Sequence, residues 1–183
     1  LLLKEYLAYK LYNIITDNSF RVHLFKIKYV DPGGKKTRMR YGFLIESEEE
    51  LAKRLDAREM EPDSIILKKA DRKNIIQMGM FQFMIGNTDF SMLTMHNLVA
   101  VELKKSHITV LIAYDFDYAG LVNAQYATPN EELRIRDVKD RWFNIKGCSR
   151  KEIEEQIQNF QEHKTEIISY CRNFKLLKKH THS

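Results

Sequence analysis

The most informative pattern in the chain is a pair of short apolar runs joined by a polar link. The runs extend from Leu98 to Leu103 and from Ile108 to Ala113, and residues 104–107 separate them. Short β-rich runs with a brief polar link are typical of an antiparallel hairpin. If the turn centres on Lys105 and Ser106, the numbers of facing residues sum to about 211.

This register predicts that polar side chains meet at the open end of the hairpin. Asn97 falls opposite Tyr114 and His96 opposite Asp115, and such facing residues have Cα atoms about 4.5 to 5.5 Å apart. Two polar clusters that are distant in sequence are therefore expected to converge. Asp89 stands before the first cluster.

Asp117 closes the second cluster, so carboxylates and an amide are expected at one place. Hard cations such as Mg²⁺ take oxygen ligands. The pattern therefore predicts a magnesium or phosphate site at the strand ends.

Three segments have helical periodicity. Leu1 to about Asp17 is expected to form a helix, and Asp71 to Ile85 a second one that stops at Gly86. Ser149 and Glu152 have the spacing of a capping box at the start of the last helix. The second helix has one apolar stripe that we expect to face the core: Ile75, Ile76, Gly79, Met80, Phe83 and Met84.

Two strands and a short helix are predicted in the first third of the chain. Arg21 to Val30 and Arg38 to Glu46 alternate apolar and charged residues, which predicts one apolar and one charged face. Asp31 to Gly34 begins the turn between them. Ser47 to Leu55 has an acidic first turn typical of a helix, and the polar stretch from Ala57 to Leu67 is expected to be a loop.

The composition indicates one domain with a real core. The chain has 183 residues, of which 44% are hydrophobic and 30% charged. No apolar run reaches the roughly 18 residues that a membrane-spanning helix needs. The net charge of +5 mildly favours anionic partners. Cys148 and Cys171 fit no metal-ligand spacing; they could pair with each other or with another segment, or remain free.

The order of the polar motifs resembles the active centre of atypical protein-kinase-like families, nearest to the spore-coat (CotH-like) kinases and their bacterial relatives, and more distantly to the HipA-like kinases. The resemblance covers about two thirds of the chain, from the first helix through the YGFLIES segment to the hairpin. The loop before the second motif is longer than in ordinary protein kinases. The motifs are Asn87-Thr88-Asp89, His96-Asn97 and Asp115-Phe116-Asp117.

The resemblance implies an α+β, protein-kinase-like fold over a single domain, residues 1–183. Residues 1–55 would supply the helix and strands of the N-terminal lobe and the hinge. Residues 71–183 would form the helical C-terminal lobe with the catalytic hairpin at residues 98–113. Because the chain begins without Met and inside an expected helix, the N-terminal strands of the first lobe are expected to be missing.

The resemblance also assigns roles to individual residues. Asp89 would orient the attacking hydroxyl or accept its proton, and Asn97 and Asp115 would hold Mg²⁺. Asp117 would bind a second ion or support the loop. Glu5 would pair with a phosphate-binding lysine from upstream strands, unless it is a solvated helix residue.

Two further residues have open roles. His96 would lie beside the metal ligands or pack in the core, because oxygen ligands suit Mg²⁺ better than imidazole. Glu46 either approaches the nucleotide or is a charge at the sheet edge.

The function implied by the resemblance is transfer of phosphate from ATP, with Mg²⁺, to a hydroxyl of a protein or small molecule. The partners would be a nucleotide and that acceptor, with no nucleic acid and no transmembrane segment; the compartment stays open. One alternative is an inactive kinase-like module that binds nucleotide or a partner. The others are a purely structural role or a metal-dependent hydrolase that uses Asp89, His96, Asp115 and Asp117.

Overall fold

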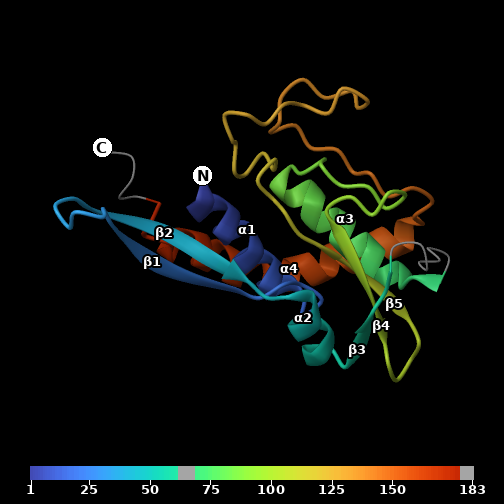
Figure 1. Ribbon diagram of the computed structural model, residues 1–183. Coiled ribbons are helices and arrows are strands. Elements are labelled where there is room, and N and C mark those ends of the chain that lie inside the picture. The colour runs from blue at the N-terminus through green and yellow to red at the C-terminus, as the bar shows by residue number, and fades with distance from the viewer. Residues whose placement is uncertain (62–68, 178–183) are drawn as a thin grey trace.

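The computed structural model describes residues 1–61 and 69–177. These form four helices and two small antiparallel sheets, so the predicted α+β class is confirmed (Figure 1). The elements in chain order are α1 (Leu2–Ile15), β1 (Val22–Val30), β2 (Thr37–Ile45), α2 (Glu48–Arg54), β3 (Ala57–Glu59), α3 (Arg72–Ile85), β4 (Leu98–Leu103), β5 (Thr109–Ala113) and α4 (Arg150–Asn173).

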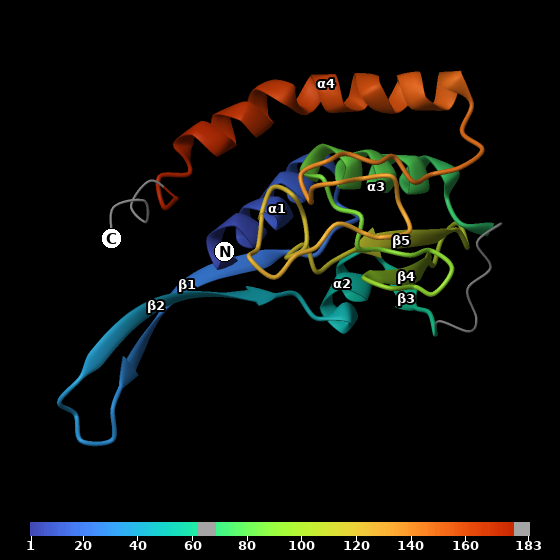
Figure 2. The same cartoon turned by 90° about the horizontal axis from the view of Figure 1, so that it is seen from above.

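In the body of the molecule, α1, α3 and α4 are stacked on one side of the sheet β3-β4-β5 (Figure 2). In Figure 2, α3 lies between this sheet and α4. The inner end of α1 packs on α3 through Tyr12 and Phe81, whose stacked rings have centroids 4.2 Å apart. Both side chains are completely buried, and aromatic pairs of this kind add specific geometry to the burial of apolar area.

The register of the central hairpin is the predicted one. Leu98 pairs with Ala113 and Val101 with Val110, so the numbers of facing residues do sum to 211. The second strand begins at Thr109, one residue later than predicted. The short link explains the agreement, because the length of a hairpin link determines which residues face each other.

The prediction of a loop from Ala57 to Leu67 is wrong at its start. Ala57–Glu59 is strand β3, which pairs with β4 so that Ala57 faces Leu103. The strand has only three residues, too few for alternation to be recognised. Residues 62–68, the rest of that prediction, lie outside the described part of the chain.

Only part of the apolar stripe predicted for α3 faces the core: Ile76 and Gly79 are buried, but the rest of the stripe is not. Phe83 is 40% exposed, and Met80 and Met84 line a shallow groove against α4. On the side of α3 that faces the sheet, Asn74 forms two hydrogen bonds with the backbone of Leu111. Its Nδ2 donates to the Leu111 carbonyl oxygen, and its Oδ1 accepts from the Leu111 N–H. The buried residues of α3 are Asn74, Ile76, Met78, Gly79, Phe81, Gln82 and Ile85.

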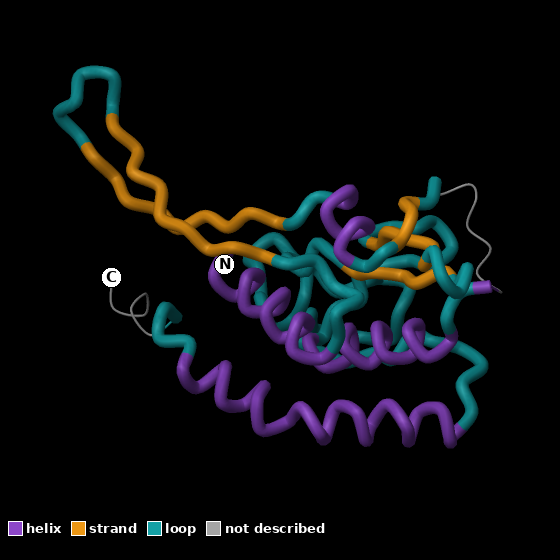
Figure 3. The backbone as a smooth tube through the Cα atoms, turned by 90° about the horizontal axis from the view of Figure 1, so that it is seen from below, coloured by secondary structure: helices purple, strands orange, loops and turns teal. Residues whose placement is uncertain are grey.

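The strands β1 and β2 form a ribbon that projects away from the body (Figures 1 and 3). Its predicted division into an apolar and a charged face is wrong, because Lys26 pairs with Tyr41 and Ile27 with Arg40. Paired residues share a face, so each face mixes apolar and basic side chains. Residues 22–45 contain six Lys or Arg and one Asp, a net charge of +5 that equals that of the whole chain. The basic character of the protein therefore belongs to the ribbon.

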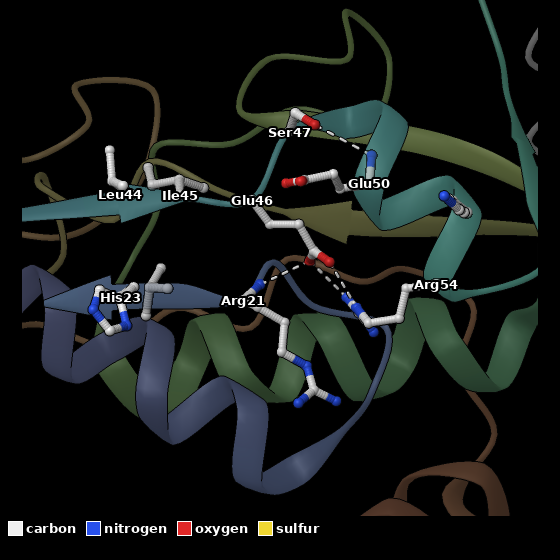
Figure 4. Close-up of a pocket in the computed structure, with 10 residues that line it drawn as sticks. Arg21, His23, Leu44, Ile45, Glu46, Ser47, Glu50 and Arg54 are labelled. Atoms are coloured by element: carbon white, nitrogen blue, oxygen red, sulfur yellow. Dashed lines mark hydrogen bonds and ion pairs between the residues drawn. The ribbon is translucent and has the colours of Figure 1, made fainter.

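Glu46 fastens the base of the ribbon to α2. Its carboxylate accepts hydrogen bonds of 2.8 Å from Nε and Nη2 of Arg54 and one of 2.9 Å from the Arg21 backbone (Figure 4). Burial alone would raise the pKa of Glu46, but these donors outweigh it and lower the pKa. The open pocket beside this cluster has a volume of about 780 Å³. Because Arg54 and the Arg21 backbone already bind the Glu46 carboxylate, Glu46 has a structural role beside this pocket.

The last helix begins as predicted. Ser149 and Glu152 form the capping box of α4, with side chain bonded to backbone in both directions. The helix lies along α1 and α3, but much of its apolar side stays exposed, including Ile157 at 40%. Cys148 and Cys171 are free. None of the described helices is long and apolar enough to cross a bilayer.

Candidate functional site

Phe116 anchors the predicted Asp-Phe-Asp motif in the core. Its ring is fully buried and lies 4.7 Å from that of Tyr9, in an edge-on contact. Because the motif directly follows β5, this anchor leaves Asp115 and Asp117 on the solvent side of the sheet end. The backbone N–H of Asp115 donates to the hydroxyl of Tyr9 at 2.8 Å.

Asp115 has a φ of +56°, in the left-handed region that residues other than glycine rarely adopt. Asn97, which immediately precedes β4 and lies opposite Tyr114, has a φ of +53°. Outliers of this kind cost about 1–3 kcal/mol each and gather at functional sites. Asp56, Met95, His107 and Asn123 also have a positive φ, so these two outliers are consistent with a site at this end of the hairpin but do not establish one.

A buried amide positions Asp89. The helix α3 ends at Gly86, and Asn87 then turns inward, where its Nδ2 donates to Gln82 Oε1 at 3.0 Å. Its Oδ1 accepts from the backbone N–H of Asp89 at 3.1 Å. Asn87 is completely buried, so the loop that carries Asp89 is fixed to the core.

The long loop between Asp89 and Asn97 closes on itself. Ser91 and His96 exchange two backbone hydrogen bonds of 3.1 Å, which brings the chain back toward its start. As a result Nδ2 of Asn97 donates to the backbone oxygen of Asp89 at 2.8 Å and to its Oδ2 at 3.0 Å. The carbonyl oxygen of Asn97 accepts from the N–H of Tyr114 at 3.1 Å, as the hairpin register predicts.

His96 lies beside the site but not where the register predicts. It pairs with Ser91 instead of Asp115, because the positive φ of Asn97 ends the ladder before His96. Its Nε2 lies 3.2 Å from Oδ1 of Asp89. The side chain is 56% exposed, so core packing is excluded and His96 contacts the site through Asp89.

The predicted acidic residues influence one another. Desolvation raises the pKa of Asp115, and the negative charges of Asp117 and Asp89 raise it further. Glu5, on α1, has its pKa raised from 4.5 to about 7 by burial and then by the charges of Asp115 and Asp117. The structure therefore brings Glu5 near Asp115 and Asp117.

No Lys or Arg of the described residues forms an ion pair with these four acids. Lys4, beside Glu5 in sequence, donates instead to the backbone oxygen of Val122 at 3.1 Å. The lysine partner expected for Glu5 is therefore not found in the described chain. The negative charge of the site is left without a basic side chain to balance it.

Two tyrosines at the site were not predicted. Tyr126 donates from its hydroxyl to Oδ2 of Asp117 at 2.6 Å, which raises the pKa of Tyr126 to about 12. Nothing in the sequence pointed to Tyr126, because it lies in an irregular segment. Tyr9 could have been found, since it is four residues after Glu5 and shares its helix face.

The donors at the site suit a hard cation by their chemistry. Because the amide nitrogen of Asn97 is bonded to Asp89, the amide oxygen of Asn97 has no partner in these bonds and could act as a ligand. However, within residues 1–61 and 69–177 no three His, Cys, Asp or Glu side chains are arranged to hold a metal ion. The case for Mg²⁺ therefore depends on the oxygen donors and on the repulsion between the neighbouring carboxylates, which a bound cation would reduce.

Two cavities border the site. One, of about 240 Å³, is lined by Thr88 and Asp89 and by residues that follow Asp117. The other, of about 270 Å³, is lined by Met95, Leu98 and Tyr114 among others.

No protein-family model, no curated protein and no solved structure matches the chain. The resemblance to kinase-like families therefore depends on the motifs in the sequence.

Proposed function

We propose that this protein is a kinase-like phosphotransferase that uses ATP and Mg²⁺ to phosphorylate a hydroxyl group. The observation that carries the proposal is the double hydrogen bond from the Asn97 amide to Asp89, at 2.8 and 3.0 Å. These bonds hold Asp89, the candidate base, against Asn97, a candidate metal ligand. Asn97 lies at the open end of the hairpin, and Asp115 follows the other strand at that same end. Phosphoryl transfer depends mainly on such positioning and on charge neutralisation.

The proposed step is an in-line displacement. The acceptor oxygen forms a bond to the γ-phosphorus of ATP, while the bond from that phosphorus to the β–γ bridging oxygen breaks and ADP leaves. Asp89 orients the hydroxyl and takes its proton. Asn97 keeps Asp89 in place, and Asn87 fixes the loop from the opposite side.

Mg²⁺, when bound, would neutralise charge on the phosphates. Asn97 and Asp115 would hold it, with Asp117 beside them. Glu5, on α1, would pair with a lysine from upstream strands that binds the phosphates. The cavity of about 270 Å³ would receive the adenine ring against Met95 and Leu98, although Glu48, Glu59 and Glu61 also line it.

A second candidate function is an inactive module that binds nucleotide without transferring phosphate. The absence of any Lys or Arg ion pair at Glu5 within the described residues favours it. Kinase-like catalysis uses a lysine paired with a helix glutamate to hold the phosphates.

The test is isothermal titration with Mg·ATP followed by an assay of phosphate transfer. Asp115→Asn is expected to abolish Mg²⁺-dependent binding. Asp56→Asn is the matched control, because Asp56 is an exposed aspartate that also has a positive φ, of +49°, and lies far from the site in the fold. Loss of binding in both variants, or in neither, would contradict the proposal.

The assay separates the alternatives. Binding without turnover supports the inactive module. Hydrolysis of small phosphate esters that requires Mn²⁺ or Zn²⁺ but no ATP supports the hydrolase, in which the contact of 3.2 Å between His96 and Asp89 would be used.

A further inference from the structure

A small closed-in cavity lies directly beside the candidate base, with a volume of about 240 Å³. Asp89 and its neighbour Thr88 form one wall. The segment that follows the Asp-Phe-Asp motif supplies the others. Its polar lining residues are Thr88, Asp89, Tyr118, Thr128, Asn130 and Glu131.

Backbone contacts hold the walls of this cavity together. The N–H groups of Gly120 and Leu121 donate at 2.9 Å to the carbonyl oxygens of Gly86 and Ile85, at the end of α3. A Cβ atom on Gly120 would lie 2.5 Å from the carbonyl oxygen of Val138, so only glycine lets that wall approach. The cavity is therefore part of the fold.

Aromatic packing also fixes one side of it. Tyr118 lies against Tyr126, with ring centroids 5.6 Å apart, and Tyr126 is in turn bonded to Asp117. Asp89 lines the cavity and also contacts Asn97 of the acidic site, so the two features adjoin at Asp89.

The lining has a clear charge preference. Its two charged residues are both acids, Asp89 and Glu131, and Lys, Arg and His are absent from it. An anionic guest would face like charges without compensation, whereas a cationic guest would be attracted. The hydroxyl and amide groups of the lining suit a hydroxylated guest.

We propose that this cavity is the acceptor site and that it binds a small cationic alcohol, such as an amino sugar. The inference rests on the proposed function. The ammonium group lies toward Glu131 and the hydroxyl at Asp89. The volume is below the roughly 300–1,000 Å³ of sites for drug-sized ligands, so one ring fills it.

The test uses three hexoses of similar size that differ in charge: glucosamine, glucose and glucuronate. Binding to the protein is measured without ATP by ligand-observed NMR titration. We expect affinity to fall in that order, and Glu131→Gln to weaken glucosamine by about fivefold while leaving glucose unchanged. Glu132→Gln is the matched control, because Glu132 is the next residue and lies outside the lining.

Each outcome decides the proposal. It is overturned if glucuronate binds as well as glucosamine, if Glu132→Gln has the same effect as Glu131→Gln, or if no hexose binds. A second measurement follows phosphate transfer from ATP to the three sugars. Equal transfer to all three overturns the inference and leaves the proposed function standing. Charge-selective binding without Mg·ATP binding supports the cavity and refutes the phosphotransferase.

Discussion

The hydroxyl of Tyr9 accepts a hydrogen bond of 2.8 Å from the backbone N–H of Asp115. Tyr9 is completely buried in α1, and burial raises its pKa. The bond joins the first helix to a residue more than a hundred positions later, at the point where the backbone takes a positive φ. Tyr9 therefore supports the conformation that presents the Asp115 carboxylate.

Replacing Tyr9 by Phe is expected to destabilise the protein by about 1–3 kcal/mol, because it leaves the Asp115 N–H without its acceptor. Urea denaturation measures the change. The control is Tyr12→Phe, one turn further along α1. Tyr12 is equally buried, but its hydroxyl has no hydrogen-bond partner among the described residues. Its loss should be neutral or stabilising, and equal losses in the two variants would show that Tyr9 does not support Asp115.

Asn97 is expected to have two separable roles. Asn97→Ala removes both hydrogen bonds to Asp89 and also places a less suitable residue at a φ of +53°. Asn97→Gly removes the same hydrogen bonds but tolerates the backbone. The alanine variant should therefore be less stable than the glycine variant by about 1 kcal/mol in urea denaturation.

Both variants should lose Mg·ATP binding to a similar extent, because both lack the amide. If Asn97→Gly binds Mg·ATP like the unmodified protein in isothermal titration, the amide is not a ligand and Asn97 acts through the backbone alone.

The central hairpin was predictable because one short pattern specifies it. Two apolar runs and the four-residue polar link between them predict the pairing, and with it the meeting of Asn97 and Tyr114. The position of Asp89 beside Asn97 was not implied by that pattern. It depends on the closure between Ser91 and His96, which is a local backbone contact without a residue signature.

Other features depended on tertiary contacts that the sequence does not encode locally. The faces of the β1-β2 ribbon were assigned from the alternation in each strand, but the pairing of Ile27 with Arg40 mixes them. The buried side of α3 includes Asn74 and Gln82, whose polarity argues for solvent. Their hydrogen bonds to Leu111 and Asn87 make burial possible.

Tyr126 is expected to compete with a cation for Asp117. Its hydroxyl occupies Oδ2 of Asp117 at 2.6 Å, so Tyr126→Phe frees that oxygen. Since such a bond contributes about 0.5–1.5 kcal/mol, affinity for Mg²⁺ should rise about two- to tenfold. The residue is 50% exposed, so the melting temperature without Mg²⁺ should hardly change. Weaker Mg²⁺ binding in titration would mean that Tyr126 orients Asp117 instead of shielding it.

Glu5 is expected to make stability depend on pH. Its pKa in the folded protein is about 7, above the value of 4.5 for the free group, so the folded state binds the extra proton between these pH values. The contribution of Glu5 to stability is therefore greatest below about pH 4.5. This contribution falls as the pH rises toward 7 and does not change above that pH. Solvent reaches the group, so screening reduces the loss to on the order of 1 kcal/mol.

Glu5→Gln should therefore stabilise the protein at pH 8 but not at pH 4.5, as measured by urea denaturation at both values. The control is Glu166→Gln, because Glu166 is an exposed residue of α4 that forms no ion pair with residues 1–61 or 69–177. Mg²⁺ should oppose the effect, since a cation favours the ionised carboxylates: it should raise the melting temperature of the unmodified protein more at pH 8 than at pH 5.5. An equal rise at both values, or a pH profile that Glu5→Gln leaves unchanged, would mean that Glu5 does not belong to the acidic site.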